Sequence, residues 1–242
     1  MNTLSRRKFL GAAGAITAAA AGLGRFGEAL AAGHIQPTAS DALLVIDMQN
    51  CFVPGGTLPV KEGDKIAPLI TQIAQRFQNV VLTQDWHTRD HVSFASQHQG
   101  KKPFELIALF YGNQVLWPDH CVQGSKDAEI VTGIEIPHAQ LIIRKGYNSK
   151  VDSYSAFLEA DRKTETGLAG YLKERQIKNV YLCGLATDYC VAWSALDARR
   201  SGFGASVIDD ACRGIDLNGS LAKAWDEMGK AGVRRIQSSD IA

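Results

Sequence analysis

The stretch Gly184-Leu185-Ala186-Thr187-Asp188-Tyr189-Cys190 decides how this chain folds. It follows a short apolar run, residues 180–183, which predicts a buried strand, and it precedes residues 191–201, which predict a helix. A cysteine at a strand-to-helix turn lies near unpaired N–H groups and the positive end of the helix dipole. Such surroundings lower the pKa of a thiol and favour the thiolate. We therefore expect Cys190 to be a nucleophile; the alternative is a small, buried, inert side chain.

Strand and helix patterns alternate on both sides of this stretch. The strand patterns are continuous apolar runs, which are typical of parallel strands buried on both faces. The alternation predicts an α/β fold with a mainly parallel sheet. Residues 88–138 are rich in His, Gly, Pro and aromatic residues, and we expect an irregular, functional loop there. The predicted strands cover residues 42–46, 80–83, 141–143, 180–183, 205–208 and 233–236, and the predicted helices cover residues 64–78, 167–175, 191–201 and 220–230.

The size and charge of the chain exclude several functional classes. A chain of 242 residues with 45% hydrophobic and 21% charged residues is typical of a globular protein with one domain. The formal net charge is +1 and no basic stripe is present, so nucleic acid is not an expected partner. Beyond the N-terminal segment, no apolar run reaches the roughly 18 residues of a membrane span.

The N-terminus has the pattern of an export signal. Arg6 and Arg7 form a twin-arginine pair, a weakly apolar Ala- and Gly-rich segment follows, and residues 29–31 offer an Ala-x-Ala cleavage site. We expect a twin-arginine signal peptide over residues 1–31, a linker over 32–41 and a single domain over 42–242. The twin-arginine export machinery is then a partner and the periplasm the destination. The alternative is an Ala-rich surface helix or a disordered tail.

The five cysteines are an odd number, so at least one of them is free even if disulfides form after export. Because the twin-arginine pathway carries folded proteins, a cysteine enzyme assembled in the cytoplasm could keep its thiol intact. The cysteines are Cys51, Cys121, Cys183, Cys190 and Cys212.

Four predicted strand ends deliver reactive side chains to one edge of the sheet: Asp47, Asp85, Lys145 and the turn before Cys190. Ligands of such sheets bind at the carboxyl ends of the strands. A carboxylate can take the proton of the thiol as a general base, and a lysine can keep that carboxylate ionised. The thiolate would attack an acyl carbon, an amine would leave, and water would hydrolyse the thioester. The alternatives are a helix N-cap for Asp47 and a solvated surface charge for Lys145.

A second cluster combines one carboxylate with three imidazoles: Asp85, His87, His91 and His120. In an extended Asp-x-His segment both side chains turn to the same face. The set predicts a site for one divalent metal ion, with Zn²⁺ favoured and Fe²⁺ or Mn²⁺ as alternatives. The alternative is ordinary polar loop surface, which is how we interpret His34, His98 and His138.

Aromatic residues follow the same strand ends and predict a slot for a flat ring, since small-molecule pockets are mostly apolar with a few polar groups. The alternative is ordinary core or lid packing. The residues are Phe52, Trp86, Trp117 and Tyr154.

These motifs together resemble the nicotinamidases, which belong to the isochorismatase-like cysteine hydrolases. The resemblance runs from about residue 42 to the C-terminus and rests on residues 47–50, 85–87, 117–121, 145–146 and 184–190. It implies a parallel sheet of about six strands with helices on both faces. It also implies hydrolysis of nicotinamide to nicotinate and ammonia, with pyrazinamide as a second substrate.

The resemblance further implies a role for each site residue. Asp47, Lys145 and Cys190 would form a catalytic triad. Asp85, His87 and His120 would ligate the metal, with His91 in the set or acting through water, and the metal would hold the pyridine nitrogen. Phe52, Trp117 and Tyr154 would border the ring. The Leu185–Ala186 peptide would be cis, and the amides of Ala186 and Cys190 would form the oxyanion hole.

Two departures from the family pattern leave alternatives open. Cys51 stands where the family usually has Asp, and it could oxidise with Cys190 or pack as a small apolar group, which we favour. The export signal is unusual for enzymes expected in the cytoplasm, so the protein could salvage external nicotinamide or act on a related amide. The competing functions are an amidase for another small amide or carbamoyl compound and an inactive periplasmic metal-binding protein. The native metal and the oligomeric state, including a homo-oligomer, are left open.

Overall fold

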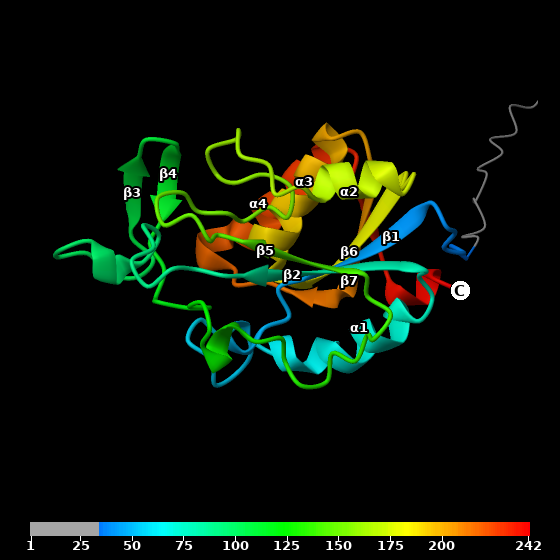
Figure 1. The fold of residues 1–242 in the computed structure, drawn as a ribbon, viewed down its shortest axis with the longest axis horizontal. Helices are drawn as coiled ribbons and strands as arrows, with labels where there is room; N and C mark the ends of the chain where they lie inside the picture. Colours follow the sequence, from blue (N-terminus) through cyan, green and yellow to red (C-terminus); the bar gives the residue numbers. More distant parts are fainter. Residues whose placement is uncertain (1–33) are drawn as a thin grey trace, which may run out of the picture. The chain divides into compact units, whose positions relative to one another are not determined.

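The computed structural model describes residues 34–242 (Figure 1). The expected signal peptide and the start of the expected linker lie outside these described residues. Within residues 34–242, no helix has the length and apolar character needed to cross a membrane.

A six-stranded parallel sheet forms the centre of the fold, in the order β5-β2-β1-β6-β7-β8. Every pairing within it is parallel. All six residues of the central strand β1 are buried, which explains why the five residues after Asp41 are all apolar. The strands are β1 (Asp41–Ile46), β2 (Asn79–Asp85), β5 (Leu141–Lys145), β6 (Asn179–Leu185), β7 (Gly204–Arg213) and β8 (Arg234–Ile236).

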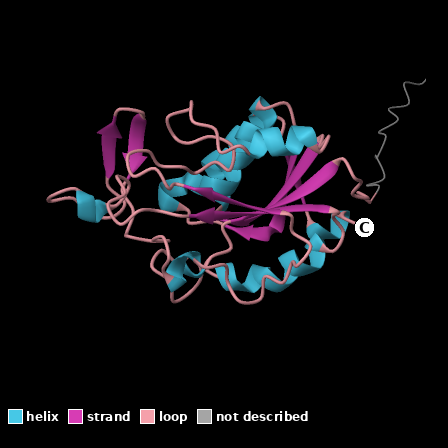
Figure 2. Cartoon of the chain, in the orientation of Figure 1, coloured by secondary structure: helices cyan, strands magenta, loops and turns pink. Residues whose placement is uncertain are grey.

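Helices cover both faces of the sheet, which confirms the predicted α/β class. Helix α1 (Ala67–Ala74) lies on one face, and α2 (Leu168–Glu174), α3 (Ala192–Arg200) and α4 (Ser220–Lys230) lie on the other (Figures 1 and 2). The helix predicted over residues 64–78 is shorter than expected, because a 3₁₀ turn (Gly63–Ile66) precedes Pro68 at the start of α1.

The segment expected to be irregular, residues 88–138, contains a β-hairpin. Strand β3 (Leu106–Leu109) pairs with β4 (Gly112–Val115) in antiparallel register. The turn between them carries Phe110, which is 79% exposed, and β4 begins at Gly112 with φ 129°. The pairing was missed because β3 has no polar-apolar alternation: its four apolar residues are partly or largely exposed.

Residues 35–41, expected to be a linker, are hydrogen-bonded to the domain. The Ile35 N–H donates to the Asp240 carbonyl at 2.6 Å, and the Ala242 N–H donates to the Ile35 carbonyl at 2.9 Å. The Thr38 hydroxyl donates to the Asp41 carboxylate at 2.6 Å. These contacts join the start of the described chain to its C-terminus.

Gly184 allows the ends of β6 and β1 to lie side by side. It adopts φ 113°, and a Cβ placed there would lie 2.1 Å from the Ile46 carbonyl oxygen. Only glycine fits this position. The close approach brings the turn that ends in Cys190 next to Asp47, the residue that follows β1.

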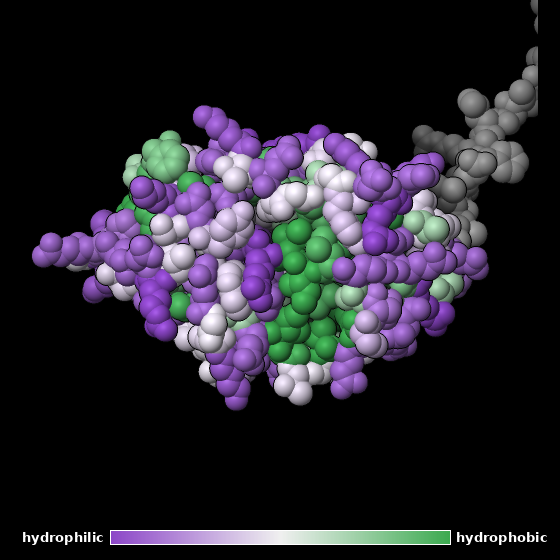
Figure 3. All heavy atoms as spheres, viewed as in Figure 1, coloured by the Kyte–Doolittle hydropathy of each residue, from purple (hydrophilic) through white to green (hydrophobic). Residues whose placement is uncertain are grey.

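Hydrophobic side chains gather in the middle of the viewed face, framed by polar residues (Figure 3). Ile142 of the edge strand β5 is one of the large hydrophobic residues on the surface, with 49% of its area exposed.

Candidate active site

Asp47 directly follows β1, Asp85 and Lys145 are the last residues of β2 and β5, and the turn after β6 leads to Cys190, at the edge of the sheet predicted from the sequence. Asp47 has a left-handed backbone, φ 45°. Its N–H donates to the Thr83 hydroxyl at 3.0 Å, and that hydroxyl donates to Asp47 Oδ1 at 2.5 Å. Thr83 on the neighbouring strand therefore fixes both the backbone and the side chain of Asp47.

Lys145 lies at the centre of the site and is completely buried. Its Nζ is 2.8 Å from Asp47 Oδ2 and 2.5 Å from Asp85 Oδ1. It also donates to the Ser153 carbonyl at 3.0 Å and to Cys190 Sγ at 3.3 Å. One ammonium thus contacts both carboxylates and the thiol, and Asp47 and Cys190 present atoms within 4.8 Å of each other.

The charges of these groups follow from burial and from this contact set. Burial lowers the pKa of Lys145, but Asp47 and Asp85 raise it further, so the pKa lies well above its ordinary value and the amine stays charged. Burial raises the pKa of Asp85, but Lys145 and His87 together lower it below its ordinary value. For Asp47, burial outweighs the attraction of Lys145 and raises the pKa. Asp47 is therefore the more basic of the two carboxylates.

The thiol of Cys190 does not have the lowered pKa expected from its position in the sequence. Burial raises its pKa well above the ordinary value, and the nearby Lys145 only partly offsets this effect. The residue lies inside a π-helical turn, Thr187–Val191, and is 5% exposed, so desolvation dominates over the helix terminus. The raised pKa favours the neutral thiol, and the Asp47 carboxylate is the nearby group with a raised pKa that could accept its proton.

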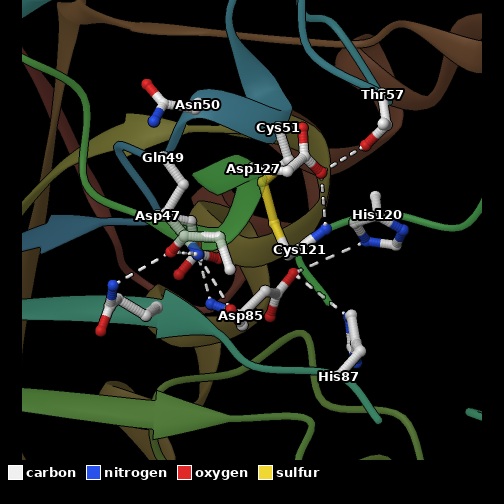
Figure 4. The surroundings of a disulfide bond; sticks show 12 residues. Asp47, Gln49, Asn50, Cys51, Thr57, Asp85, His87, His120, Cys121 and Asp127 are labelled. Atoms are coloured by element: carbon white, nitrogen blue, oxygen red, sulfur yellow. Dashed lines mark hydrogen bonds and ion pairs between the residues drawn. A yellow bond between two sulfur atoms is a disulfide. The ribbon is translucent and has the colours of Figure 1, made fainter. Parts of the chain in front are cut away.

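Asp85, His87 and His120 converge as the sequence predicted for a metal site. Asp85 Oδ2 is 3.6 Å from His87 Nε2 and 3.9 Å from His120 Nε2 (Figure 4). The Nδ1 atoms of the two rings are 2.9 Å from the Gly146 carbonyl and 2.8 Å from the Pro118 carbonyl. With Nδ1 donating to a carbonyl, each Nε2 presents a lone pair toward Asp85.

Gly146 makes room for the His87 ring. A Cβ at this position, which has φ 68°, would lie 2.5 Å from His87 Cε1. The glycine after Lys145 therefore lets the β5 end approach the imidazole closely enough for the carbonyl contact.

His91 lies beside His87 but faces other partners. The two ring centroids are 4.2 Å apart. His91 Nδ1 is 2.7 Å from the Ser93 hydroxyl, and Nε2 is 3.3 Å from the Val151 carbonyl. His91 groups with His87 and Asp152, while Asp85, His87 and His120 form a separate group. Burial and His87 lower the pKa of His91 to about 4, so it is neutral.

The group of Asp85, His87 and His120 fits a divalent metal ion. All three residues are buried, and their donor atoms lie within 4.8 Å of one another. One carboxylate oxygen and two imidazole nitrogens are donors that Zn²⁺, Fe²⁺ and Mn²⁺ accept, with positions left for water or substrate.

A pocket of about 330 Å³, including the space at its mouth, opens beside these donors and Cys190. Phe52, Trp117 and Tyr154 line it, as expected for a ring slot. Trp86 does not, because the Arg144 guanidinium stacks on its ring at 3.8 Å. The Leu185–Ala186 peptide at the pocket wall is cis.

Four pocket residues were not predicted from the sequence: Leu58, Asp152, Tyr189 and Ile215. Tyr189 lies inside the Cys190 motif, so its aromatic side chain next to Cys190 in the sequence was the available signal. Ile215 reaches the pocket because Asp188 accepts hydrogen bonds from the N–H groups of Ile215 and Asp216, at 2.9 and 2.8 Å. No local pattern indicates this contact across 27 residues.

Cys51 forms a disulfide with Cys121, and this corrects the two alternatives considered for it (Figure 4). It neither pairs with Cys190 nor packs as a free thiol. The Cα atoms are 5.5 Å apart, within the usual range for a disulfide. Among the described residues, Cys183, Cys190 and Cys212 are free. The pairing could not be predicted because 70 residues separate the two cysteines.

Known proteins resemble this chain over nearly all of its described length. Residues 41–240 match the family model of the isochorismatase domain. A nicotinamidase of Acinetobacter baylyi is 58% identical over 200 residues, which cover 83% of this chain and 94% of that protein. The solved structure of a nicotinamidase and pyrazinamidase of Acinetobacter baumanii is 60% identical and has a TM-score of 0.83. The match covers 84% of this chain and 98% of that one.

A third relative is a solved structure with a metal. It is the pyrazinamidase of Pyrococcus horikoshii in complex with zinc, which is 36% identical with a TM-score of 0.68; the match covers 82% of this chain and 99% of that one. From the family match, the identities and the shared fold, this chain belongs to the isochorismatase-like hydrolases and, within them, to the nicotinamidases, which are amidohydrolases.

Proposed function

We propose that this protein hydrolyses nicotinamide to nicotinate and ammonia through Cys190, with one divalent metal ion held by Asp85, His87 and His120. Pyrazinamide, which has a similar flat ring and a carboxamide, is the proposed second substrate. The observation that carries the proposal is the position of Lys145, whose buried ammonium contacts Asp47 and the two pocket-lining residues Asp85 and Cys190. The nucleophile and the metal donors are thereby presented to the same small molecule.

The proposed first step is attack of Cys190 Sγ on the amide carbon. Asp47, with its raised pKa, takes the thiol proton as the Sγ–C bond forms. The N–H groups of Ala186 and Cys190 are the proposed donors to the oxyanion. Asp47 then returns the proton to the leaving nitrogen, the C–N bond breaks, and ammonia departs from a thioester on Cys190.

Water completes the proposed reaction. Asp47 takes one proton from a water molecule that attacks the thioester, and the acid leaves as Cys190 regains a proton. Lys145 stays charged throughout. Its ammonium stabilises the negative charge of Asp47 and of the developing thiolate. A bound divalent ion would supply a Lewis acid to which the ring nitrogen can bind.

Phe52, Trp117 and Tyr154 are proposed to hold the ring. Phe52 and Trp117 are almost fully buried, and Tyr154 accepts a hydrogen bond from Trp117 Nε1 at 3.0 Å. His91 is proposed to support the metal site through its neighbour His87, because its nitrogens face Ser93 and Val151.

Ammonia release tests this function. We expect wild-type protein to release ammonia from nicotinamide and pyrazinamide, to lose this activity with a chelator, and to regain it with Zn²⁺, Fe²⁺ or Mn²⁺. Cys190→Ala should bind the metal but release no ammonia. Turnover of a carbamoyl compound but not of nicotinamide would favour the amidase alternative. Metal binding without turnover of any amide would favour a metal-binding protein.

We also propose that residues 1–31 direct export by the twin-arginine machinery, so that the enzyme acts on nicotinamide outside the cytoplasm. The support is the Arg6-Arg7 pair followed by an Ala-rich segment and an Ala-x-Ala site. Cell fractionation should find the protein in the periplasm with an N-terminus at Ala32. The change Arg6→Lys with Arg7→Lys should keep it in the cytoplasm, and an unprocessed wild-type chain in the cytoplasm would contradict export.

A further inference from the structure

We propose that the Cys51–Cys121 disulfide positions the metal site and the pocket wall, and that oxidation closes it in the folded protein. This inference rests on the metal site proposed above. The bond lies at the junction of two segments, residues 47–58 after β1 and residues 120–130 before β5, which between them carry Phe52 and His120 (Figure 4).

On one side, Cys121 is linked to both histidines of the metal group. It follows His120 directly in the chain. Its carbonyl accepts a hydrogen bond from the His87 N–H at 3.1 Å. Its own N–H donates to the Asp127 carboxylate at 3.1 Å, and that same oxygen accepts from Thr57 at 2.6 Å. Movement of Cys121 would therefore displace the backbones of both imidazole donors.

On the other side, Cys51 is linked to the pocket. It precedes Phe52, whose ring centroid lies 5.5 Å from that of His120, and its carbonyl accepts from the Leu58 N–H at 2.9 Å. Phe52, Leu58 and His120 all line the pocket. The disulfide thus joins residues 47–58, which supply Phe52 and Leu58 to the pocket wall, to residues 120–130, which carry the proposed metal donor His120.

The two segments also share hydrogen bonds that do not involve the cysteines. The Asn50 N–H donates to the Glu129 carbonyl at 2.9 Å, and Gln49 Nε2 donates to the Ala128 carbonyl at 2.8 Å. These contacts bring the two thiols together before they are joined. The covalent bond then limits how far His120 can move from Asp85.

The chemistry of closure is thiol–disulfide exchange. The Cys51 and Cys121 thiols lose two protons and two electrons as the Sγ–Sγ bond forms, and a protein or small-molecule disulfide is reduced to two thiols. Both cysteines are 0% exposed, so exchange requires brief opening of this junction, and the finished bond is shielded from reductant. Such a bond persists in an oxidising compartment, which is the destination proposed for this chain.

Thiol counting tests whether the bond exists. Protein treated with oxidised glutathione and then unfolded should show three free thiols, those of Cys183, Cys190 and Cys212, and five after reduction. Digestion should yield one linked pair of peptides containing Cys51 and Cys121. Five free thiols after oxidation, or a link between other cysteines, would overturn the proposal.

Metal retention tests the positioning role without any substrate. The double variant Cys51→Ser with Cys121→Ser should lose Zn²⁺ to a chelator about tenfold faster than oxidised wild type, as for other losses of support around metal ligands. Cys212→Ser, a buried free cysteine outside the pocket, is the matched control and should keep its metal. Wild type compared before and after oxidation gives the same test with no substitution, should the variants fold poorly.

The outcomes separate this inference from the proposed function. If melting temperatures fall but Zn²⁺ loss is unchanged, the disulfide is a structural bond and the positioning role is wrong. If the wild type turns over no amide but the double variant still loses Zn²⁺ faster than the wild type, the positioning role holds while the proposed function fails.

Discussion

Asp47 and Cys190 illustrate how burial assigns roles to two titratable residues. Both groups have raised pKa values because they are desolvated, and Lys145 offsets this only in part. A neutral thiol beside a basic carboxylate can react only when the proton moves between them. This differs from a cysteine activated in advance by a helix terminus, which the sequence alone suggested.

Asp47→Asn tests the role of the base. The amide can keep the contact with Thr83 but cannot take the thiol proton, so we expect ammonia release from nicotinamide to fall about 10²- to 10⁴-fold. Zn²⁺ content should not change, because the proposed metal donors are Asp85, His87 and His120. Asp226→Asn, at an exposed carboxylate of helix α4 outside the pocket, is the control. Activity within a factor of a few of wild type would show that Asp47 is not the base.

The raised pKa of Cys190 predicts a distinct pH dependence of alkylation. Because the folded pKa lies above the ordinary value, the thiolate fraction at neutral pH is smaller than in a free cysteine and grows as pH rises through and beyond about 8.5. Iodoacetamide should therefore label Cys190 more slowly than a cysteine peptide at pH 7.5, with a rate that keeps rising above about pH 9.

Mass spectrometry after a timed reaction measures this labelling. Cys190→Ser provides the background from Cys183 and Cys212, which are also buried. A labelling rate that levels off below pH 7 would mean that the resting residue is already a thiolate, contrary to the raised pKa.

At the scale of elements, the hairpin β3–β4 supports the pocket through Gln114. This residue is 1% exposed, and its Nε2 donates to Asp152 Oδ2 at 2.7 Å and to Tyr154 Oη at 3.0 Å. Tyr111 of the hairpin turn donates to Gln114 Oε1 at 3.0 Å. The hairpin is therefore tied to two residues that line the ring pocket.

Gln114→Met should weaken substrate binding. Methionine has a similar length but cannot donate, so Asp152 and Tyr154 lose a buried partner, at a cost of about 1–3 kcal/mol. We expect a raised KM for nicotinamide with a smaller change in kcat, measured by ammonia release. Asn113→Met, at the exposed neighbouring position, should behave as wild type. Equal KM values for the two variants would show that the hairpin does not support the pocket.

Elements and site residues were predictable from the sequence where a local pattern determines them. Buried strands gave continuous apolar runs, and the polar residues one or two positions after each run then lay at the predicted edge, which located Asp47, Asp85 and Lys145. The hairpin was missed because its apolar residues stay exposed. Ile215 was missed because its place in the pocket depends on the hydrogen bond to Asp188, far from it in the sequence. The disulfide partner of Cys51 was missed because Cys121 lies 70 residues away.

At the scale of the whole molecule, the start and the end of the described chain stabilise each other. Ile35 pairs with Ile241 in a short parallel bridge, and the adjoining N–H and carbonyl groups of residues 35, 240 and 242 are hydrogen-bonded. None of these residues lines the ring pocket. Removing them should therefore affect stability and leave catalysis unchanged.

Two shortened chains test this separation, one beginning at residue 34 and one at residue 41. The shorter chain loses the two hydrogen bonds of Ile35 and the partial burial of its side chain. It also loses the Thr38–Asp41 contact and the hydrogen bonds that the Ala39 and Ser40 carbonyls accept, so its free energy of unfolding should be about 2–4 kcal/mol lower. Urea unfolding measures this difference. At a temperature where both are folded, kcat and KM for nicotinamide should agree, because every residue proposed for the site lies between 47 and 190. Equal stability would mean that residues 34–40 act as a linker, as their sequence suggested, whereas a loss of activity in the folded shorter chain would mean that this bridge also supports the pocket.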